Sequence, residues 1–153
     1  MNFYYSIGVK ILYKKILVGY DGSEGGERAL SRALEISKES NSELCIVTVI
    51  PPASVIVGEI LSPDVINTAA IMESSRKKLS EIASKLESQG YKIRFDVLSG
   101  DPGDTIVNYA ESNGCDLIVL GRRRLSKFER LILGSVTNKV AGKSMSADVL
   151  VVP

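Results

Sequence analysis

Two glycine-containing stretches of this sequence combine backbone freedom with carboxylate or hydroxyl groups. Residues 19–23 read Gly-Tyr-Asp-Gly-Ser, and a second stretch begins at Gly121 and ends with Gly-Ser-Val-Thr at 134–137. A helix that starts at Gly134 presents free N–H groups and partial positive charge to a phosphate, and glycine admits an anion close to the backbone. Ser135 and Thr137 add hydroxyl donors. The segment between is basic, with Arg122, Arg123, Arg124 and Lys127. The pattern is typical of a phosphate site, and equally of an ordinary helix start beside a solvated basic loop.

Asp21 is the acidic residue of the first stretch, and it follows an apolar run. Its carboxylate is suited to accept a hydrogen bond from a ligand. Asp-Gly is also a frequent turn dipeptide, so Asp21-Gly22 has a purely conformational explanation as well. The sequence leaves both explanations open.

Several kinds of catalytic and metal site are excluded by composition. The sequence has no histidine, which removes Ser-His-Asp and Cys-His catalysis and every imidazole metal site. The sequence contains no cluster of three carboxylates that would indicate a metal site. Cys45 and Cys115 are too few for a disulfide framework, and their apolar surroundings predict buried free thiols. Residues 142–144 read Gly-Lys-Ser like the end of a P-loop, but Thr137 stands where its first glycine is required. The first stretch lacks the Gly-x-Gly-x-x-Gly order, so we expect no dinucleotide cofactor.

The charges of the chain are balanced. Nineteen basic and eighteen acidic residues leave a net charge of +1. This balance gives no general attraction to nucleic acid or to an anionic membrane, so we expect neither as a partner. No apolar run reaches the ~20 residues of a transmembrane helix, and the first residues do not resemble a signal peptide. We therefore expect a cytoplasmic location.

Short apolar runs alternate with longer segments of helical periodicity. The runs predict strands at 15–20, 44–50, 91–98, 116–120 and 148–152. The alternating polarity of 91–98 indicates an edge strand. Helices are expected to follow Ser23, to include 79–86, and to span 101–113 and 134–146. In the last helix we expect Val136 and Val140 to face the core, with Met145 as a third candidate.

This alternation predicts an α/β fold in which a five-stranded parallel sheet carries helices on both faces. We expect the flavodoxin-like or Rossmann-like arrangement with strand order 3-2-1-4-5. The domain is expected over residues 14–153, after an aromatic-rich N-terminal extension over 1–13. Residues 51–63 form the one long irregular connection. A lid over the ligand-binding edge and a tolerated surface loop are both compatible with it.

Residues 14–153 resemble the universal stress protein family. The resemblance is carried by 15–23 (KILVGYDGS), 47–50 (VTVI), 116–121 (DLIVLG), 133–137 (LGSVT) and 147–152 (ADVLVV). In ATP-binding members the nucleotide loop reads Gly, two residues, Gly, nine residues, Gly, then Ser or Thr. Here Gly121, Arg124 and Gly134-Ser135 occupy these positions. The spacing is kept, and arginine replaces the middle glycine.

The resemblance implies binding of ATP or AMP, with Mg or Mn carried on the phosphates. Asp21 is implied to hydrogen-bond near the adenine or ribose, and Val49 to contact the adenine. Gly121 is implied to meet the ribose-phosphate region, while 134–136 bind phosphates. The full set of candidate binding residues is Gly19, Tyr20, Asp21, Val49, Gly121, Arg122, Arg124, Gly134, Ser135, Val136 and Thr137. The family also implies a homodimer through the last strand, and residues 149–152 form an uncharged run suited to an open strand edge.

The function expected is therefore that of a stress-response regulator that binds an adenine nucleotide. The alternative is an interaction module of the same fold without nucleotide binding. A third hypothesis, weak ATP hydrolysis with Asp21 orienting a water, lacks a recognisable general base, and we assign no catalytic residue. At position 124 an arginine with φ > 0 costs roughly 1–2 kcal/mol, which glycine avoids. We predict that Arg124→Gly tightens ATP binding by about 1 kcal/mol, roughly fivefold.

Overall fold

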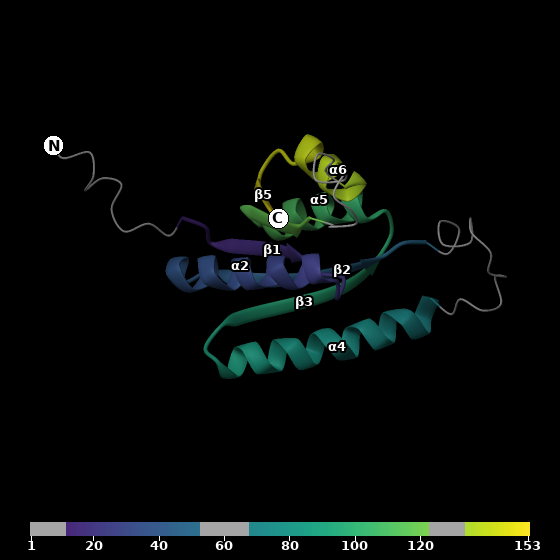
Figure 1. The fold of residues 1–153 in the computed structure, drawn as a ribbon. Coiled ribbons are helices and arrows are strands. Elements are labelled where there is room, and N and C mark those ends of the chain that lie inside the picture. The colour runs from purple at the N-terminus through teal and green to yellow at the C-terminus, as the bar shows by residue number, and fades with distance from the viewer. Residues whose placement is uncertain (1–11, 53–67, 123–133) are drawn as a thin grey trace.

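The architecture is a five-stranded parallel sheet between two layers of helices (Figure 1). The computed structural model describes residues 12–52, 68–122 and 134–153. Along the chain lie β1 (Lys15–Gly19), α2 (Glu24–Ser40), β2 (Glu43–Ile50), α4 (Thr68–Ser88), β3 (Lys92–Ser99), α5 (Pro102–Asn113), β4 (Leu117–Gly121), α6 (Ser135–Lys143) and β5 (Asp148–Val152). The strand order β3-β2-β1-β4-β5, with every neighbouring pair parallel, confirms the predicted topology.

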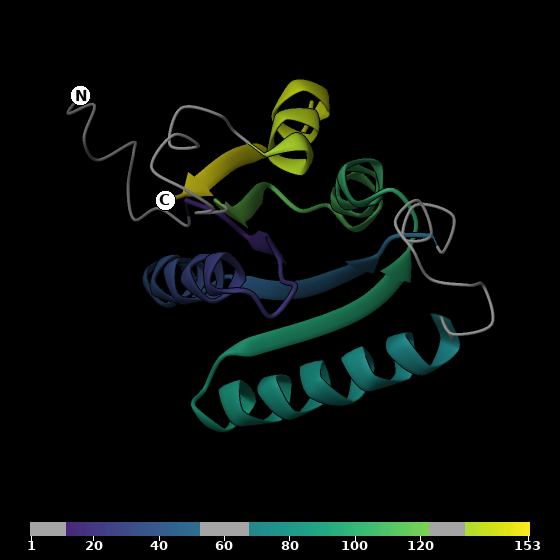
Figure 2. The same ribbon diagram turned by 45° about the vertical axis from the view of Figure 1, so that its right-hand side comes forward.

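The core consists of two apolar clusters, one on each face of the sheet. Helices α2 and α4 pack on the face formed by Ile16, Val18, Leu44 and Ile46, and α5 and α6 on the opposite face (Figure 2). Successive side chains of a strand point to opposite faces, so central strands need uninterrupted apolar runs. Cys45 and Cys115 lie in the second cluster as buried free thiols, as predicted.

The helix boundaries follow the local signals of the sequence. The Ser23 side chain accepts a hydrogen bond from the backbone of Gly26 and caps α2, while Asp101 accepts one from Asp104 and caps α5. Gly114 ends α5 in the left-handed conformation, with φ 67°, where glycine has no steric penalty. Strand β3 lies at a sheet edge, as its alternating polarity predicted.

Helix α6 is shorter than predicted. It ends at Lys143 instead of Ser146, because Ser144 adopts an extended conformation and its hydroxyl donates to the carbonyl of Ala147. The expectation that Met145 faces the core is wrong, since the side chain follows the helix end and is 93% exposed. Val140 is fully buried as expected.

The N-terminal extension expected over 1–13 and the connection 51–63 fall largely outside the described residues. Of the extension, Leu12 and Tyr13 are described. The Tyr13 hydroxyl donates to Asp148 at 2.9 Å, and its carbonyl accepts from Ser42. Tyr13 therefore joins the domain where β1 and β5 begin.

Candidate functional site

The first stretch and Gly121 meet where β1 and β4 end. Ile16 lies opposite Leu117 and Val18 opposite Val119, so the residues that follow the two strands emerge at the same edge of the sheet. The chain then continues from β1 into α2 on one face, and from β4 towards α6 on the other. Ligands of doubly wound sheets bind at such a topological switch point. We define the carboxyl-edge site as residues 19–23, 121–122 and 134–137.

Gly121 contacts helix α2 directly. A Cβ atom at Gly121 would lie 1.8 Å from the carbonyl oxygen of Gly25, and one at Gly25 would lie 3.0 Å from the carbonyl oxygen of Arg122. Two glycines therefore allow the end of β4 to cross the first turn of α2. The absence of a side chain at Gly121 is required by this packing, whether or not a ligand approaches.

Gly19 and Tyr20 are held within the protein at the end of β1. A Cβ at Gly19 would lie 2.6 Å from the Leu120 side chain. Tyr20 is 4% exposed, and its hydroxyl donates to Glu27. Its backbone N–H donates to Val47, and its carbonyl accepts from Thr48 at 2.6 Å. Burial, and then the Glu27 hydrogen bond, raise the pKa of Tyr20 to about 12. Tyr20 thus anchors the turn instead of presenting a side chain to a ligand.

Asp21 projects from the turn and is exposed. Its Oδ1 accepts from both the backbone and the hydroxyl of Ser23, so the carboxylate has a fixed orientation. Gly22 has φ 79°, and a Cβ there would lie 2.9 Å from the Lys78 ammonium. The turn explanation of Asp21-Gly22 is confirmed by this geometry, and an exposed, oriented carboxylate remains free to contact a ligand as well.

Val49 is half-buried near the end of β2, beside the first stretch in the sheet. It packs against the cluster under α5 and α6, while Val47 of the same strand lies opposite Gly19. Val49 therefore lies on the strand next to β1, which leads into the Asp21 turn.

Within the described residues, the N-terminus of α6 has no close neighbour at its first position. Gly134 caps the helix without a side-chain hydrogen bond, has φ −59°, and would accept a Cβ with no described atom within 4 Å. Ser135 is exposed and Val136 half-buried, whereas Thr137 is 5% exposed. Gly134 and Ser135 therefore present backbone and hydroxyl groups to solvent, and Thr137 contributes mainly to the core.

Helix α6 is docked on α5 by exposed ion pairs. Lys139 lies 2.9 Å from Asp101, and Lys143 lies 2.7 Å from Asp104. The backbone hydrogen bond from Asp104 and then the Lys139 ammonium lower the pKa of Asp101, and the Lys143 ammonium lowers the pKa of Asp104. These contacts hold the rear of α6 while its N-terminus stays exposed.

The sequence did not identify Arg28, which binds the ends of two strands. Its Nε donates to the carbonyl of Pro153 at 2.9 Å, and its Nη2 donates to the carbonyl of Arg122 at 3.0 Å. The only local signal was the spacing of Arg28 from Glu24, which is common on helix surfaces.

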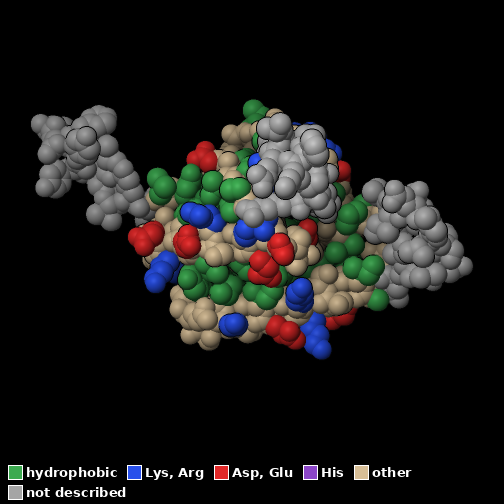
Figure 3. Space-filling model, viewed as in Figure 1, with side chains coloured by type: hydrophobic (Ala, Val, Ile, Leu, Met, Phe, Trp, Pro, Cys, Tyr) green, Lys and Arg blue, Asp and Glu red, His purple; other side chains and the backbone are tan. Residues whose placement is uncertain are grey.

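Arg124, with Arg123 and Lys127, lies outside the described residues. Within the described ranges, no group of three potential metal-ligating side chains is present. No helix in those ranges is long and apolar enough to cross a membrane. The visible face carries interspersed acidic and basic side chains (Figure 3).

Known proteins provide the context for this site. A family model described as "Universal stress protein family" matches residues 12–153. Universal stress protein MJ0531 of Methanocaldococcus jannaschii is 32% identical, with 92% of this chain and 82% of the relative covered. Universal stress protein YxiE of Bacillus subtilis is 31% identical, with 92% and 99% covered.

Solved structures show the same similarity. The structure of hypothetical protein MJ0577 superposes with a TM-score of 0.74 at 31% identity, and 92% and 95% of the two chains are covered. A universal stress protein crystallised in complex with cAMP has a TM-score of 0.66 at 30% identity, with 92% and 97% covered. That relative binds a cyclic adenine nucleotide.

Proposed function

Because the chain belongs to the universal stress protein family, we propose that it binds an adenine nucleotide at the carboxyl-edge site and acts as a nucleotide-dependent regulator of the stress response. The observation that carries the proposal is the meeting of the Asp21 turn with Gly121 at the switch point. The cAMP complex of a relative at 30% identity supports the same ligand class.

The described residues fit such a ligand in chemistry. The oriented, exposed carboxylate of Asp21 is suited to accept a hydrogen bond from the adenine amino group or a ribose hydroxyl. Val49 offers an apolar contact beside it. The exposed N-terminus at Gly134 and Ser135 offers N–H groups and a hydroxyl to a phosphate. A Mg or Mn ion would be carried by the phosphates, as the family resemblance implies.

Titration calorimetry with ATP, AMP, cAMP and adenosine tests this proposal. We expect the phosphorylated ligands to bind more tightly than adenosine, since the helix N-terminus favours negative charge. Asp21→Ala should weaken binding by roughly 1.5–3 kcal/mol if the carboxylate accepts a ligand hydrogen bond. Glu35→Ala is the matched control, because Glu35 is an exposed carboxylate farther along α2.

Absence of binding by all four ligands at millimolar concentration would reject the nucleotide proposal. The chain would then be an interaction module of the same fold. The arginine at position 124, in place of glycine, would account for the loss of nucleotide binding. Weak ATP hydrolysis stays a separate hypothesis, which phosphate release under saturating ATP would test.

We also propose that two copies pair through strand β5. Within the described residues β5 is a sheet edge that pairs with β4 alone, and Val149, Leu150 and Val151 are half-buried and uncharged. Open apolar edges invite pairing with another strand. Light scattering should give a dimer, and Val151→Lys should dissociate it. A monomer at high protein concentration would contradict the proposal.

A further inference from the structure

Arg28 extends from the second turn of α2 to the ends of two strands. Its side chain is 27% exposed, and Glu24 lies 3.8 Å away on the outer side. Inward, its Nε and Nη2 donate to the carbonyl oxygens of Pro153 and Arg122 at 2.9 and 3.0 Å. One planar guanidinium thus binds the residue after β4 and the residue after β5. A lysine could not reproduce this, because its ammonium lacks the fixed fork of donors.

The peptide groups around Arg122 are held from three sides. The Arg122 N–H donates to the carbonyl of Val152 at 2.8 Å. The Arg122 carbonyl accepts from Arg28. The preceding residue, Gly121, lies against the carbonyl of Gly25. Arg28 is the one member of this set whose contact depends on a side chain, so it is the point where substitution can release the peptide without disturbing the strands.

We propose that Arg28 is a positioning residue for the nucleotide site. By linking the carbonyl of Arg122 to α2 and to the end of β5, it fixes the backbone of Gly121 and Arg122, which belong to the carboxyl-edge site. The inference rests on the proposed function, because Gly121 and Arg122 are part of the proposed nucleotide site. A backbone that is already fixed at Gly121 and Arg122 lowers the loss of conformational freedom that a bound nucleotide would otherwise require.

A purely structural role for Arg28 makes a different prediction. If the guanidinium only supports the packing of α2, its loss lowers the stability of the folded protein and leaves the nucleotide affinity of folded molecules unchanged. A positioning role lowers that affinity under conditions in which every molecule is folded. Measuring nucleotide affinity and the stability of the folded protein separately therefore distinguishes the two roles.

The test compares Arg28→Gln and Arg28→Lys with Arg32→Gln in the full chain. Arg32 is the matched control, because it lies one turn further along α2 and pairs with Glu35 on the helix surface. Titration calorimetry measures ATP affinity, thermal unfolding measures stability, and NMR measures hydrogen exchange of the Arg122 amide. Loss of a charge-assisted hydrogen bond should weaken ATP binding and speed Arg122 exchange by about tenfold in Arg28→Gln. Arg28→Lys should fall between this variant and the native chain, and Arg32→Gln should match the native chain.

Each outcome decides the inference. ATP affinity that is unchanged in Arg28→Gln, in a native chain that binds ATP, overturns the positioning role and leaves the proposed function intact. Failure of the native chain to bind any adenine nucleotide overturns the proposed function, and with it the effect of Arg28 on affinity. In that case, Arg122 exchange alone decides whether Arg28 positions the chain, and unchanged exchange rejects that part as well.

Discussion

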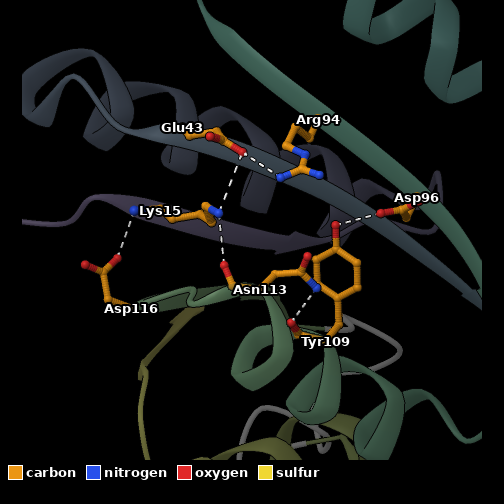
Figure 4. A network of polar contacts seen from close by, with 7 residues as sticks. All are labelled: Lys15, Glu43, Arg94, Asp96, Tyr109, Asn113 and Asp116. Carbon is orange, nitrogen blue, oxygen red and sulfur yellow. Dashed lines mark hydrogen bonds and ion pairs between the residues drawn. The ribbon is translucent and has the colours of Figure 1, made fainter.

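The two ends of the sheet are built from different kinds of contact. At the carboxyl end the contacts centre on backbone atoms: Gly121 lies against the carbonyl of Gly25, and the Thr48 hydroxyl donates to the carbonyl of Tyr20. From the amino end to the middle of the sheet, side chains from distant elements form the network of seven residues in Figure 4: Lys15, Glu43, Arg94, Asp96, Tyr109, Asn113 and Asp116. We call this the amino-end network.

The amino-end network pairs its charges internally. The Lys15 ammonium donates to the carbonyl of Asn113 at 2.9 Å and faces Glu43. Asp116 accepts from the backbone N–H groups of Lys14 and Lys15, which fixes the start of β1 beside β4. These polar groups therefore hold strands and helix ends in register.

The contrast between the two ends indicates where polar groups are available to a ligand. A polar group that is already paired within the protein gains little by contacting a ligand, whereas one facing water exchanges one partner for another. Asp21 and Ser135 at the carboxyl end are exposed. The comparison supports the proposal that a ligand binds at the carboxyl end, where exposed polar groups lie beside close backbone packing, and four substitutions test what each end contributes.

Gly121→Ala should have the largest effect. Its Cβ would lie 1.8 Å from the carbonyl oxygen of Gly25, so α2 must move away from β4. We expect a loss of about 3 kcal/mol or more in the free energy of unfolding, at the upper end for overpacking. Gly134→Ala is the control, since no described atom lies within 4 Å of its Cβ. It should cost at most about 1 kcal/mol as a change of helix cap. Equal losses in urea unfolding would contradict the packing argument.

The Tyr20 hydroxyl, at the carboxyl end, makes the free energy of unfolding depend on pH. Burial and the Glu27 hydrogen bond raise the pKa of Tyr20 to about 12, above its ordinary value of 10.0. The folded state therefore favours the protonated phenol, and this contribution is complete below pH 10 and lost as pH rises from 10 to about 12. Relative to Tyr20→Phe, the native chain should lose up to about 2 kcal/mol over that range. Parallel stability curves for the two proteins would show that Tyr20 is not the titrating group.

Tyr109→Phe tests one contact of the amino-end network. The Tyr109 hydroxyl donates to Asp96 at 2.7 Å, and the ring is 9% exposed. Removing the hydroxyl leaves the core ring in place and should cost about 1 kcal/mol, the usual value of one hydrogen bond. ATP affinity should not change, because the contact is structural. A variant with native stability and weakened ATP binding would contradict the proposal that the ligand binds at the carboxyl end.

The sequence predicted local features well because their causes are local. Ser23 and Asp101 cap helices through atoms three residues away, and the apolar runs identify the strands. The sequence did not reveal that Gly121 is needed for packing, because its close contact is with Gly25, which is distant in the chain. It also did not reveal Arg28, whose partners follow β4 and β5. Met145 was misplaced because the end of α6 depends on the conformation of Ser144. Contacts between residues far apart in the chain produce no periodic pattern in the sequence from which they could be predicted.

The smallest effect is expected for Arg94→Gln, at the exposed rim of the amino-end network. Arg94 Nη1 lies 3.6 Å from Glu43 Oε1, but its side chain is 57% exposed. An exposed pair of this kind contributes less than about 0.5 kcal/mol, because water screens it and two long side chains lose freedom. Glu43 Oε1 is itself buried without a hydrogen bond to any described residue, so Lys15, at 4.0 Å, supplies the more shielded positive charge. A double-mutant cycle with Glu43→Gln should therefore give a larger coupling energy for Lys15→Gln than for Arg94→Gln. If added salt reduces only the Arg94 coupling, the rim is solvated and the interior of the network is not. The reverse order would mean that Arg94 holds the network together, and that the amino end is organised from its exposed edge.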